Sequence, residues 1–519
     1  MKWIVLGENK GRIVLVSSES TTGMLPKGSF LTVDEGKSKF VLRVEDSLQH
    51  DPYRPSPLVV DMDLSPLQQD RMSKNLIVAY RVFDFSRRKD GLVDYIKPQS
   101  VARRSNQAEI NLALSTVSRG PRVFVATIQY NQNQCLHDEN GIPITATLPE
   151  ESFYHQMLVC GKTGSGKTVA AKYLSQYFVE ELEGAVLAIN VKDVDLLKMD
   201  KPSVTKSDSV RHEWDALGSE PHGIDNFTIY YPANTELSAT KEVSPEICKK
   251  ITLDVKKIEP EALTGLLTKI SDIGAMSFPD IFRSWQANKA RSGADEDFTF
   301  TEFVRFFERG AADQYSFASM NVRGEESRIT LHRGTYDNIM RNLNAAVPFF
   351  DNPDADTIDE TDILHPCQMS VIDIAVPNGI QFGSILLRHL LHRIVEAKSE
   401  QRSTVPVLIV IDEVHMFYSE DASAGALGDL DTICRTGRSQ QIGVIFSSQN
   451  PQDIPTGLSS VINTKIFFKS DPGQVKKQGL SVNPLEMEAL KKGYAVAAIH
   501  DLSQLRILKF PLSYAGVFE

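Results

Sequence analysis

The chain has little cysteine and lacks any long apolar run. Its 519 residues include five cysteines, no two of which lie close together, and no Cys-x-x-Cys pair occurs. This spacing argues against a zinc site and predicts reduced thiols in a cytoplasmic protein. No stretch of about 18 consecutive apolar residues is present, so we expect no membrane span. The apolar start, Trp3–Leu6, is far too short for a signal peptide.

Positive charge is also scarce. The sequence contains 56 Lys and Arg against 67 Asp and Glu, which gives a formal net charge of −11. An acidic chain is not typical of a nucleic-acid coat protein. A protein that contacts nucleic acid over a small area, however, needs only a few basic side chains there, so the overall charge does not exclude nucleic acid. The length itself predicts about two to four domains.

The first part of the chain, residues 1–148, has a β pattern. Short apolar runs recur between turn signals such as Gly11, Gly28 and Gly36. Short strands at this spacing predict a small barrel or sandwich. No nucleotide-binding motif occurs there, so we expect this segment to dock a partner or to assemble a ring.

The remaining chain predicts an α/β fold built on a parallel sheet. A buried strand at Met157–Cys160 runs into a glycine-rich loop, a helix from residue 167 to about 183, and a second strand at Ala185–Val191. This order is the strand–helix–strand unit of parallel sheets. We assign residues 149–258 and 351–519 to this core. The periodicity of residues 259–350 predicts a helical insertion.

The glycine-rich loop fits the pattern G-x-x-x-x-G-K-[ST] at every fixed position. Its glycines allow a tight turn in which successive backbone N–H groups point at phosphates, and the helix that follows adds its N-terminal dipole. In this pattern the lysine reaches the β- and γ-phosphates and the final hydroxyl binds Mg²⁺. The sequence therefore predicts ATP and magnesium binding at Gly161-Lys162-Thr163-Gly164-Ser165-Gly166-Lys167-Thr168.

A second motif supplies two carboxylates after a strand. The apolar run Val407–Ile411 predicts a central buried strand, and Asp412 and Glu413 follow it directly. The carboxyl ends of parallel strands are where ligands bind in such folds. We expect Asp412 to hold magnesium and Glu413 to orient the attacking water.

A third region carries candidate residues with open alternatives. Arg438 precedes a core strand, and it is a candidate for an arginine that enters the ATP site of a neighbouring subunit. Arg435 is the next candidate, and the alternative is a solvated loop whose arginines pair with Asp429 and Asp431. Gln449 is a candidate γ-phosphate sensor or an ordinary polar end of a strand. His155 and His415 have no partners at metal-ligand spacing, so we expect structural or relay roles.

The order of these features resembles the HerA branch of the HerA–FtsK class of ring translocases. The most specific part is the combination of Asp412-Glu413-Val414-His415, Thr436-Gly437-Arg438 and Ser448-Gln449-Asn450-Pro451. The resemblance implies a RecA-like P-loop core with an N-terminal β-barrel, and a homohexamer that moves double-stranded DNA through its channel. It also implies a nuclease or a sirtuin-like effector as partner, in DNA end processing or antiphage defence. By position it makes Lys167 and Thr168 the nucleotide and magnesium ligands, Arg438 the trans finger and Gln449 the sensor.

Two segments depart from the family pattern. Asn450 stands where an arginine is common, and the strand after the nucleotide-binding helix ends in Asn190-Val191-Lys192-Asp193 instead of an acidic, glycine-containing turn. The asparagine weakens any role assigned to position 450, and we assign no catalytic role to residues 190–193.

Two other functions compete with a DNA-translocating motor. A DEAH-like helicase would share the residues Asp412 to His415, but it needs a second RecA-like domain. Only about 100 residues follow Glu413, which is too few. An ATP-gated scaffold that activates an effector without moving DNA stays open. Stimulation of ATP turnover by double-stranded DNA would separate it from a motor.

Overall fold

The computed structural model describes most of the chain. The described residues are 2–17, 24–50, 74–85, 92–130, 132–192, 196–237, 242–267, 272–293, 298–376, 379–417, 433, 435–454 and 456–519. They form two compact units: unit 1 contains Met1–Glu150 and Ile466–Pro511, and unit 2 contains Glu151–Lys465 and Leu512–Glu519. Among the described residues, no helix combines the length and apolar character needed to cross a bilayer.

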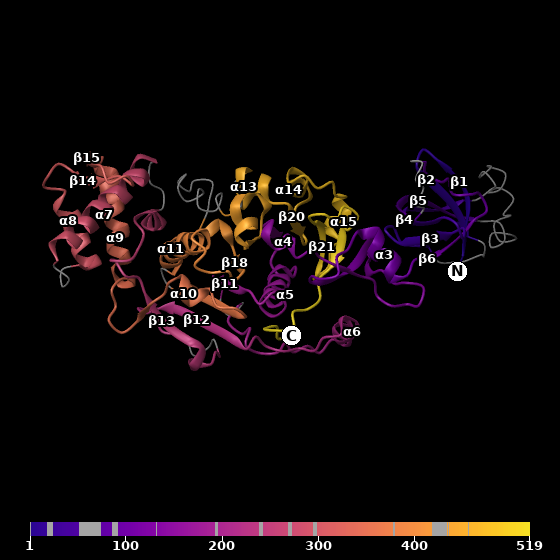
Figure 1. The fold of residues 1–519 in the computed structure, drawn as a ribbon, viewed down its shortest axis with the longest axis horizontal. Coiled ribbons are helices and arrows are strands. Elements are labelled where there is room, and N and C mark those ends of the chain that lie inside the picture. The colour runs from indigo at the N-terminus through magenta and orange to yellow at the C-terminus, as the bar shows by residue number, and fades with distance from the viewer. Residues whose placement is uncertain are drawn as a thin grey trace, which may run out of the picture. The chain divides into compact units, whose positions relative to one another are not determined.

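Unit 1 begins with a closed barrel of six strands, drawn in indigo and violet in Figure 1. Alternate side chains, among them Val5, Ile13, Leu15 and Leu42, point inward and form its core. The predicted N-terminal β-barrel is therefore confirmed. In spatial order the strands are β1 (Trp3–Asn9), β2 (Arg12–Ser17), β5 (Lys74–Asp84), β4 (Lys39–His50), β3 (Phe30–Asp34) and β6 (Val101–Arg104).

The rest of unit 1 joins segments far apart in the sequence. Strand β22 (Ile507–Lys509) pairs antiparallel with both β21 (Tyr494–Ala498) and β7 (Arg122–Gln129). Residues 466–511, assigned above to the ATPase core, therefore group with the N-terminal residues. The other elements are α3 (Gln107–Leu114), β8 (Gln132–Cys135), β9 (Thr145–Thr147), α14 (Pro472–Lys477) and α15 (Pro484–Glu488). The predicted division into domains stays a prediction.

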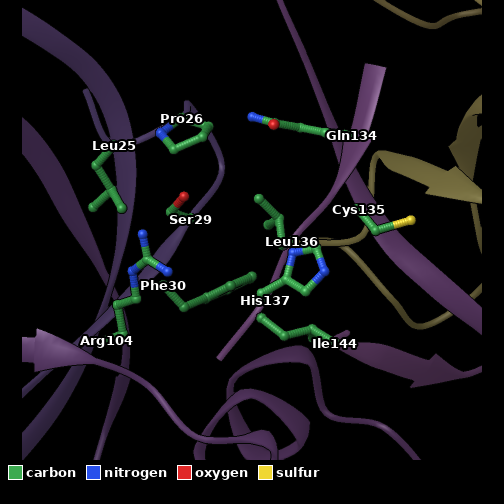
Figure 2. A pocket seen from close by; sticks show the side chains of 10 residues that line it. All are labelled: Leu25, Pro26, Ser29, Phe30, Arg104, Gln134, Cys135, Leu136, His137 and Ile144. Carbon is green, nitrogen blue, oxygen red and sulfur yellow. The ribbon is translucent and has the colours of Figure 1, made fainter. Parts of the chain in front are cut away.

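A small cavity of about 110 Å³ lies within unit 1 (Figure 2). Leu25, Pro26 and Phe30, before and at the start of β3, form one side of it. Gln134, Cys135 and Leu136, at and after the end of β8, form the other side.

Unit 2 is built on a parallel sheet, as predicted. Within the described residues, the strand pairs from β16 to β10 all run in the same direction, and the central strands are buried, as is typical of parallel sheets. The predicted α/β class is confirmed. In spatial order the strands are β16 (Asp356–Thr357), β13 (Cys248–Thr252), β12 (Asn226–Pro232), β17 (Gln368–Asp373), β11 (Ala185–Asn190), β18 (Val407–Ile411), β19 (Ile442–Ser448) and β10 (Met157–Cys160).

Helix α5 follows the glycine-rich loop and packs against the sheet. It spans Lys167–Glu180, three residues shorter than predicted. The last residues of unit 2 bond to two helices. Lys172 Nζ on α5 donates to the Gly516 carbonyl at 2.7 Å, and Trp214 Nε1 on α6 (Asp208–Leu217) donates to the Leu512 carbonyl at 2.8 Å. The other helices of the core are α4 (Glu151–Tyr154), α6 (Asp208–Leu217), α10 (Glu360–Ile363), α11 (Gly379–Ser399) and α13 (Thr456–Val461); β20 (Thr464–Phe467) leads out of unit 2.

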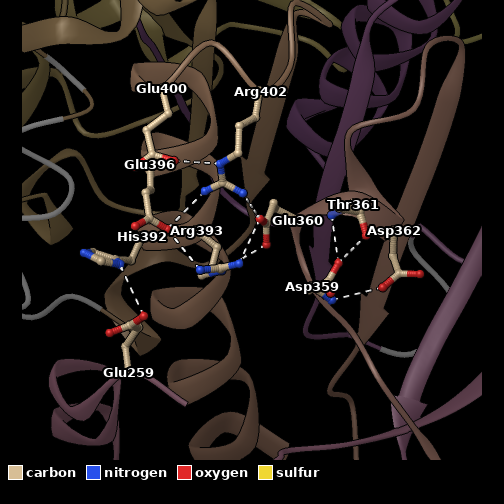
Figure 3. Close-up of polar contacts among 10 residues, drawn as sticks. All are labelled: Glu259, Asp359, Glu360, Thr361, Asp362, His392, Arg393, Glu396, Glu400 and Arg402. Carbon is tan, nitrogen blue, oxygen red and sulfur yellow. Dashed lines mark hydrogen bonds and ion pairs between the residues drawn. The ribbon is translucent and has the colours of Figure 1, made fainter. Parts of the chain in front are cut away.

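An ion-pair network joins α10 to α11 (Figure 3). The buried Glu360 carboxylate accepts hydrogen bonds from Arg393 Nε and Nη2, both at 3.0 Å, and from Arg402 Nη1 at 2.6 Å. Arg402 also contacts Glu400 on the more exposed side of the network. The three contacts fix the start of α10 against the outer end of α11.

Residues 259–350 are mostly helical, as predicted, but they also contain a two-stranded hairpin that the sequence did not predict. Their aromatic side chains pack together; the Phe307 ring stacks on Phe317 and Tyr336, with centroids 4.6 and 5.3 Å away. The elements are α7 (Asp272–Ser292), α8 (Phe300–Arg309), β14 (Ser316–Met320), β15 (Glu326–Thr330) and α9 (Arg333–Ala346).

Candidate nucleotide-binding site

The glycine-rich loop connects β10 to α5 at the carboxyl edge of the sheet. Gly164 and Gly166 have φ angles of 77° and 110°, which side chains disfavour, so both positions require glycine. The Gly161 amide donates to the Ser448 carbonyl at 3.1 Å and ties the loop to β19. Ser165 Oγ is buried and has no hydrogen-bond partner among the described residues. This orphaned hydroxyl and the glycine cradle fit a phosphate-bearing ligand.

The acidic pair lies beside this loop, at the end of β18. Both carboxylates are buried, with Asp412 5% and Glu413 1% exposed. Asp412 Oδ1 accepts hydrogen bonds from Ser447 Oγ at 2.6 Å and from the Glu413 amide at 3.1 Å. Glu413 has a left-handed backbone, with φ 46° and ψ 54°. A non-glycine residue in this conformation is strained by about 1 kcal/mol or more, and such strain is concentrated at functional sites.

The Glu413 carboxylate brings the predicted residues together. Its Oε1 lies 3.6 Å from Lys167 Nζ and accepts a hydrogen bond from Gln449 Nε2 at 3.0 Å. Lys192 Nζ contacts the same oxygen. Burial acts to raise the pKa of Glu413, but the hydrogen bonds from Lys192 and Gln449 and the charge of Lys167 outweigh it. The pKa therefore lies below its usual value, and the group is ionised at neutral pH.

Lys192 is the residue that sequence reasoning missed. Strands β11 and β18 are parallel neighbours in which Ile189 pairs with Ile411, so the residues that follow them leave the same sheet edge. This pairing delivers Lys192 to Glu413. The linear sequence offers one weak signal, a lysine two residues beyond the end of a buried strand.

The candidate arginines differ from the other predicted residues. Arg438 and Arg435 lie in the helical residues 435–440, and both side chains are exposed. Within the described part of the chain, the Arg438 guanidinium has no hydrogen bond or ion pair, and it does not join the cluster around Glu413. The alternative pairing with Asp429 and Asp431 lies outside the described residues.

The two histidines have different surroundings. The His155 carbonyl accepts from the Asn463 amide at 3.4 Å, which is a structural contact. His415 Nδ1 lies 3.5 Å from Glu413 Oε2 and 3.6 Å from Asp453 Oδ2. His415 is therefore placed where it can influence the acidic pair.

The donor atoms near the loop suit a magnesium ion. The Thr168 hydroxyl and Asp412 Oδ2 have no hydrogen-bond partner among the described residues, while Asp412 Oδ1 is held by Ser447. Hydroxyl and carboxylate oxygens are the ligands that Mg²⁺ prefers. The residues present thus fit a metal at this site.

No protein-family model matches the chain. Two curated relatives match part of it, and each is named DNA double-strand break repair helicase HerA. The Sulfolobus acidocaldarius protein is 26% identical over 149 residues, which cover 27% of this chain and 30% of the relative. The Sulfurisphaera tokodaii protein is 28% identical over 114 residues, which cover 21% of this chain and 23% of the relative. The chain is similar to HerA. This confirms the resemblance drawn from the motifs, a HerA-like P-loop ATPase, over a domain-sized part of those relatives.

Solved structures match the chain at low similarity. VirB4 of Thermoanaerobacter pseudethanolicus has a TM-score of 0.47 and 12% identity, with 76% of this chain and 97% of that chain covered. Plasmid coupling protein TrwB in complex with the non-hydrolysable GTP analogue GDPNP has a TM-score of 0.47 and 13% identity, with 80% and 94% covered. Likeness at this level supports no argument about the activity of the HerA-like chain.

Proposed function

We propose that the chain is an ATP-driven DNA translocase that works as a homohexamer. The observation that carries the proposal is the 3.6 Å approach of Lys167 Nζ to Glu413 Oε1. It joins the glycine-rich loop to the acidic pair at one sheet edge, as hydrolysis of a nucleoside triphosphate requires.

The residues have distinct roles in this mechanism. The loop amides and Lys167 bind the phosphates, and Thr168 and Asp412 hold Mg²⁺, which neutralises charge on the phosphate oxygens. Glu413 orients the attacking water and accepts its proton. Gln449 holds the Glu413 carboxylate, a role that differs from direct sensing of the γ-phosphate. Arg438 reaches the site of the adjacent subunit.

The finer parts of the proposal rest on the resemblance to HerA. The two relatives are named as double-strand break repair helicases, which supports double-stranded DNA as the substrate. A nuclease or sirtuin-like effector is the proposed partner, in DNA end processing or antiphage defence, and the barrel of unit 1 is its proposed docking site. A cytoplasmic location belongs to the same proposal.

The test is ATP turnover by the full chain with and without double-stranded DNA, combined with displacement of a DNA-bound third strand. We expect DNA to stimulate turnover and the third strand to be displaced, and Lys167→Ala to abolish both. Turnover that ignores DNA, with activation of a co-purified effector, would instead favour an ATP-gated scaffold. Imaging of the assembly tests the sixfold ring.

A further inference from the structure

The Glu413 carboxylate is held by one oxygen. Oε1 contacts Lys192 Nζ and Gln449 Nε2, and Lys167 Nζ lies 3.6 Å away. Oε2 is buried and has no hydrogen-bond partner within the described part of the chain, and His415 Nδ1 lies 3.5 Å from it. A buried carboxylate oxygen without a hydrogen bond is costly, and in a native site it calls for a functional explanation.

Lys192 differs from the other groups that hold Oε1. In this loop pattern Lys167 binds the phosphates, so once they are bound it no longer interacts with Glu413 alone. Lys192 lies two residues after β11, outside the glycine-rich loop, and its side chain is 40% exposed. Its contact with Oε1 can therefore persist while Lys167 binds phosphate.

The geometry points to Lys192 as a positioning residue for ATP hydrolysis: it anchors Glu413 Oε1 and leaves Oε2 to receive the attacking water. This inference rests on the proposed ATPase activity. In the step that it serves, a water proton passes to Oε2 as the water oxygen bonds to the γ-phosphorus. The bond from that phosphorus to the bridging oxygen breaks, and ADP leaves with the electron pair.

The geometry at Glu413 supports a role for Lys192 in positioning the carboxylate and not in inhibiting it. The left-handed conformation of Glu413 fixes the direction in which its side chain leaves the sheet edge. Lys192 contacts Oε1 and leaves Oε2 without a hydrogen bond. A lysine that inhibited Glu413 as a base would have to contact Oε2, the oxygen that accepts the proton.

The test is the kinetics of Lys192→Met in the full chain. We expect kcat to fall on the order of a hundredfold, because a misplaced catalytic group costs about that factor. KM and the affinity for ATP should stay within about twofold, since Lys192 acts through Glu413. Lys192→Arg should restore part of kcat, because it keeps a cation at Oε1, and Lys192→Gln provides a second variant of similar length.

A matched control removes a lysine–carboxylate pair that does not include Glu413. Lys198 pairs with the exposed Glu242 at 3.0 Å, and Lys198→Met should leave kcat unchanged. In a Glu413→Gln background, Lys192→Met should add no further loss in single-turnover measurements, because the two residues act as a unit.

Opposite outcomes overturn the inference separately from the proposed function. If Lys192→Met hydrolyses ATP as fast as the wild type, or faster, Lys192 does not position the base. If Lys192→Met lowers the single-turnover rate by the same factor in the Glu413→Gln background as in the wild type, Lys192 has another role. A wild-type protein without ATP turnover would overturn the proposed function and this inference with it.

Discussion

Ser447 Oγ donates a 2.6 Å hydrogen bond to Asp412 Oδ1, from β19 to the end of the neighbouring β18. This bond orients the carboxylate through Oδ1 and leaves Oδ2 as the oxygen that would bind the proposed Mg²⁺. We expect Ser447→Ala to raise the Mg²⁺ midpoint of ATP turnover by about tenfold or more, because the loss of a partner of a metal ligand usually weakens metal binding by such a factor. A magnesium titration of turnover measures it.

Ser370 offers a control for this prediction. It is equally buried, but it lies on β17 and accepts from Gln368 Nε2 at 2.9 Å, away from the acidic pair. Ser370→Ala should leave the Mg²⁺ midpoint unchanged. If both variants shift the midpoint alike, Ser447 has no specific influence on the metal.

The network around Glu360 predicts a local loss of stability. Glu360→Ala removes three charge-assisted hydrogen bonds from Arg393 and Arg402, and we expect the free energy of unfolding of unit 2 to fall by about 2 kcal/mol. Glu400 contacts Arg402 from a mostly exposed position, so Glu400→Ala should cost less than about 1 kcal/mol. Chemical denaturation of both variants compares them, and equal losses would contradict the prediction.

Glu109 predicts an acid dependence of unit 1. Burial acts to raise its pKa, but hydrogen bonds from Arg103, Lys39, Thr32 and the Asn106 amide outweigh it and lower the pKa to about 2. Because the folded pKa lies below the unfolded value of about 4.3, the stabilisation is present above that value and is lost as the pH falls toward 2.

Hydrogen exchange of the β3 amides, compared between the wild type and Glu109→Gln, measures this dependence. The greater protection of the wild-type amides from exchange should be complete at neutral pH and should decrease as the pH falls from about 4.3 to 2. A difference in protection that stays constant across this pH window would show that the Glu109 carboxyl group does not stay ionised in the folded protein.

The sequence predicted those parts of the site that lie in continuous motifs. Residues Gly161–Thr168 and the Asp412-Glu413 pair each combine a strand with the groups at its end, so local patterns were sufficient. Lys192 reaches Glu413 because β11 lies beside β18, and that strand order is not written in any local pattern. The pairing of β22 with β7 likewise joins segments almost 400 residues apart, which periodicity cannot reveal.

We expect Arg438 to act only in the assembled ring. In the single chain its guanidinium is exposed and lies outside the cluster around Glu413, as a residue that serves a neighbouring site would. We expect Arg438→Ala to keep its fold and ATP binding and to lose turnover by on the order of a thousandfold.

Glu413→Gln should also bind ATP and turn over very slowly, because the metal ligands remain but the base is lost.

Mixed rings of these two inactive variants give the decisive measurement. In the proposed ring, one heterologous contact repeated around the closure would place one subunit's Arg438 at the next subunit's Glu413. Some interfaces of a mixed ring then contain both intact groups, so turnover should reappear and should peak near equal proportions. Arg435→Ala serves as the parallel variant. If rings shown to be mixed stay inactive at every ratio, Arg438 does not act across the interface. If instead Arg435→Ala complements Glu413→Gln, Arg435 is the finger.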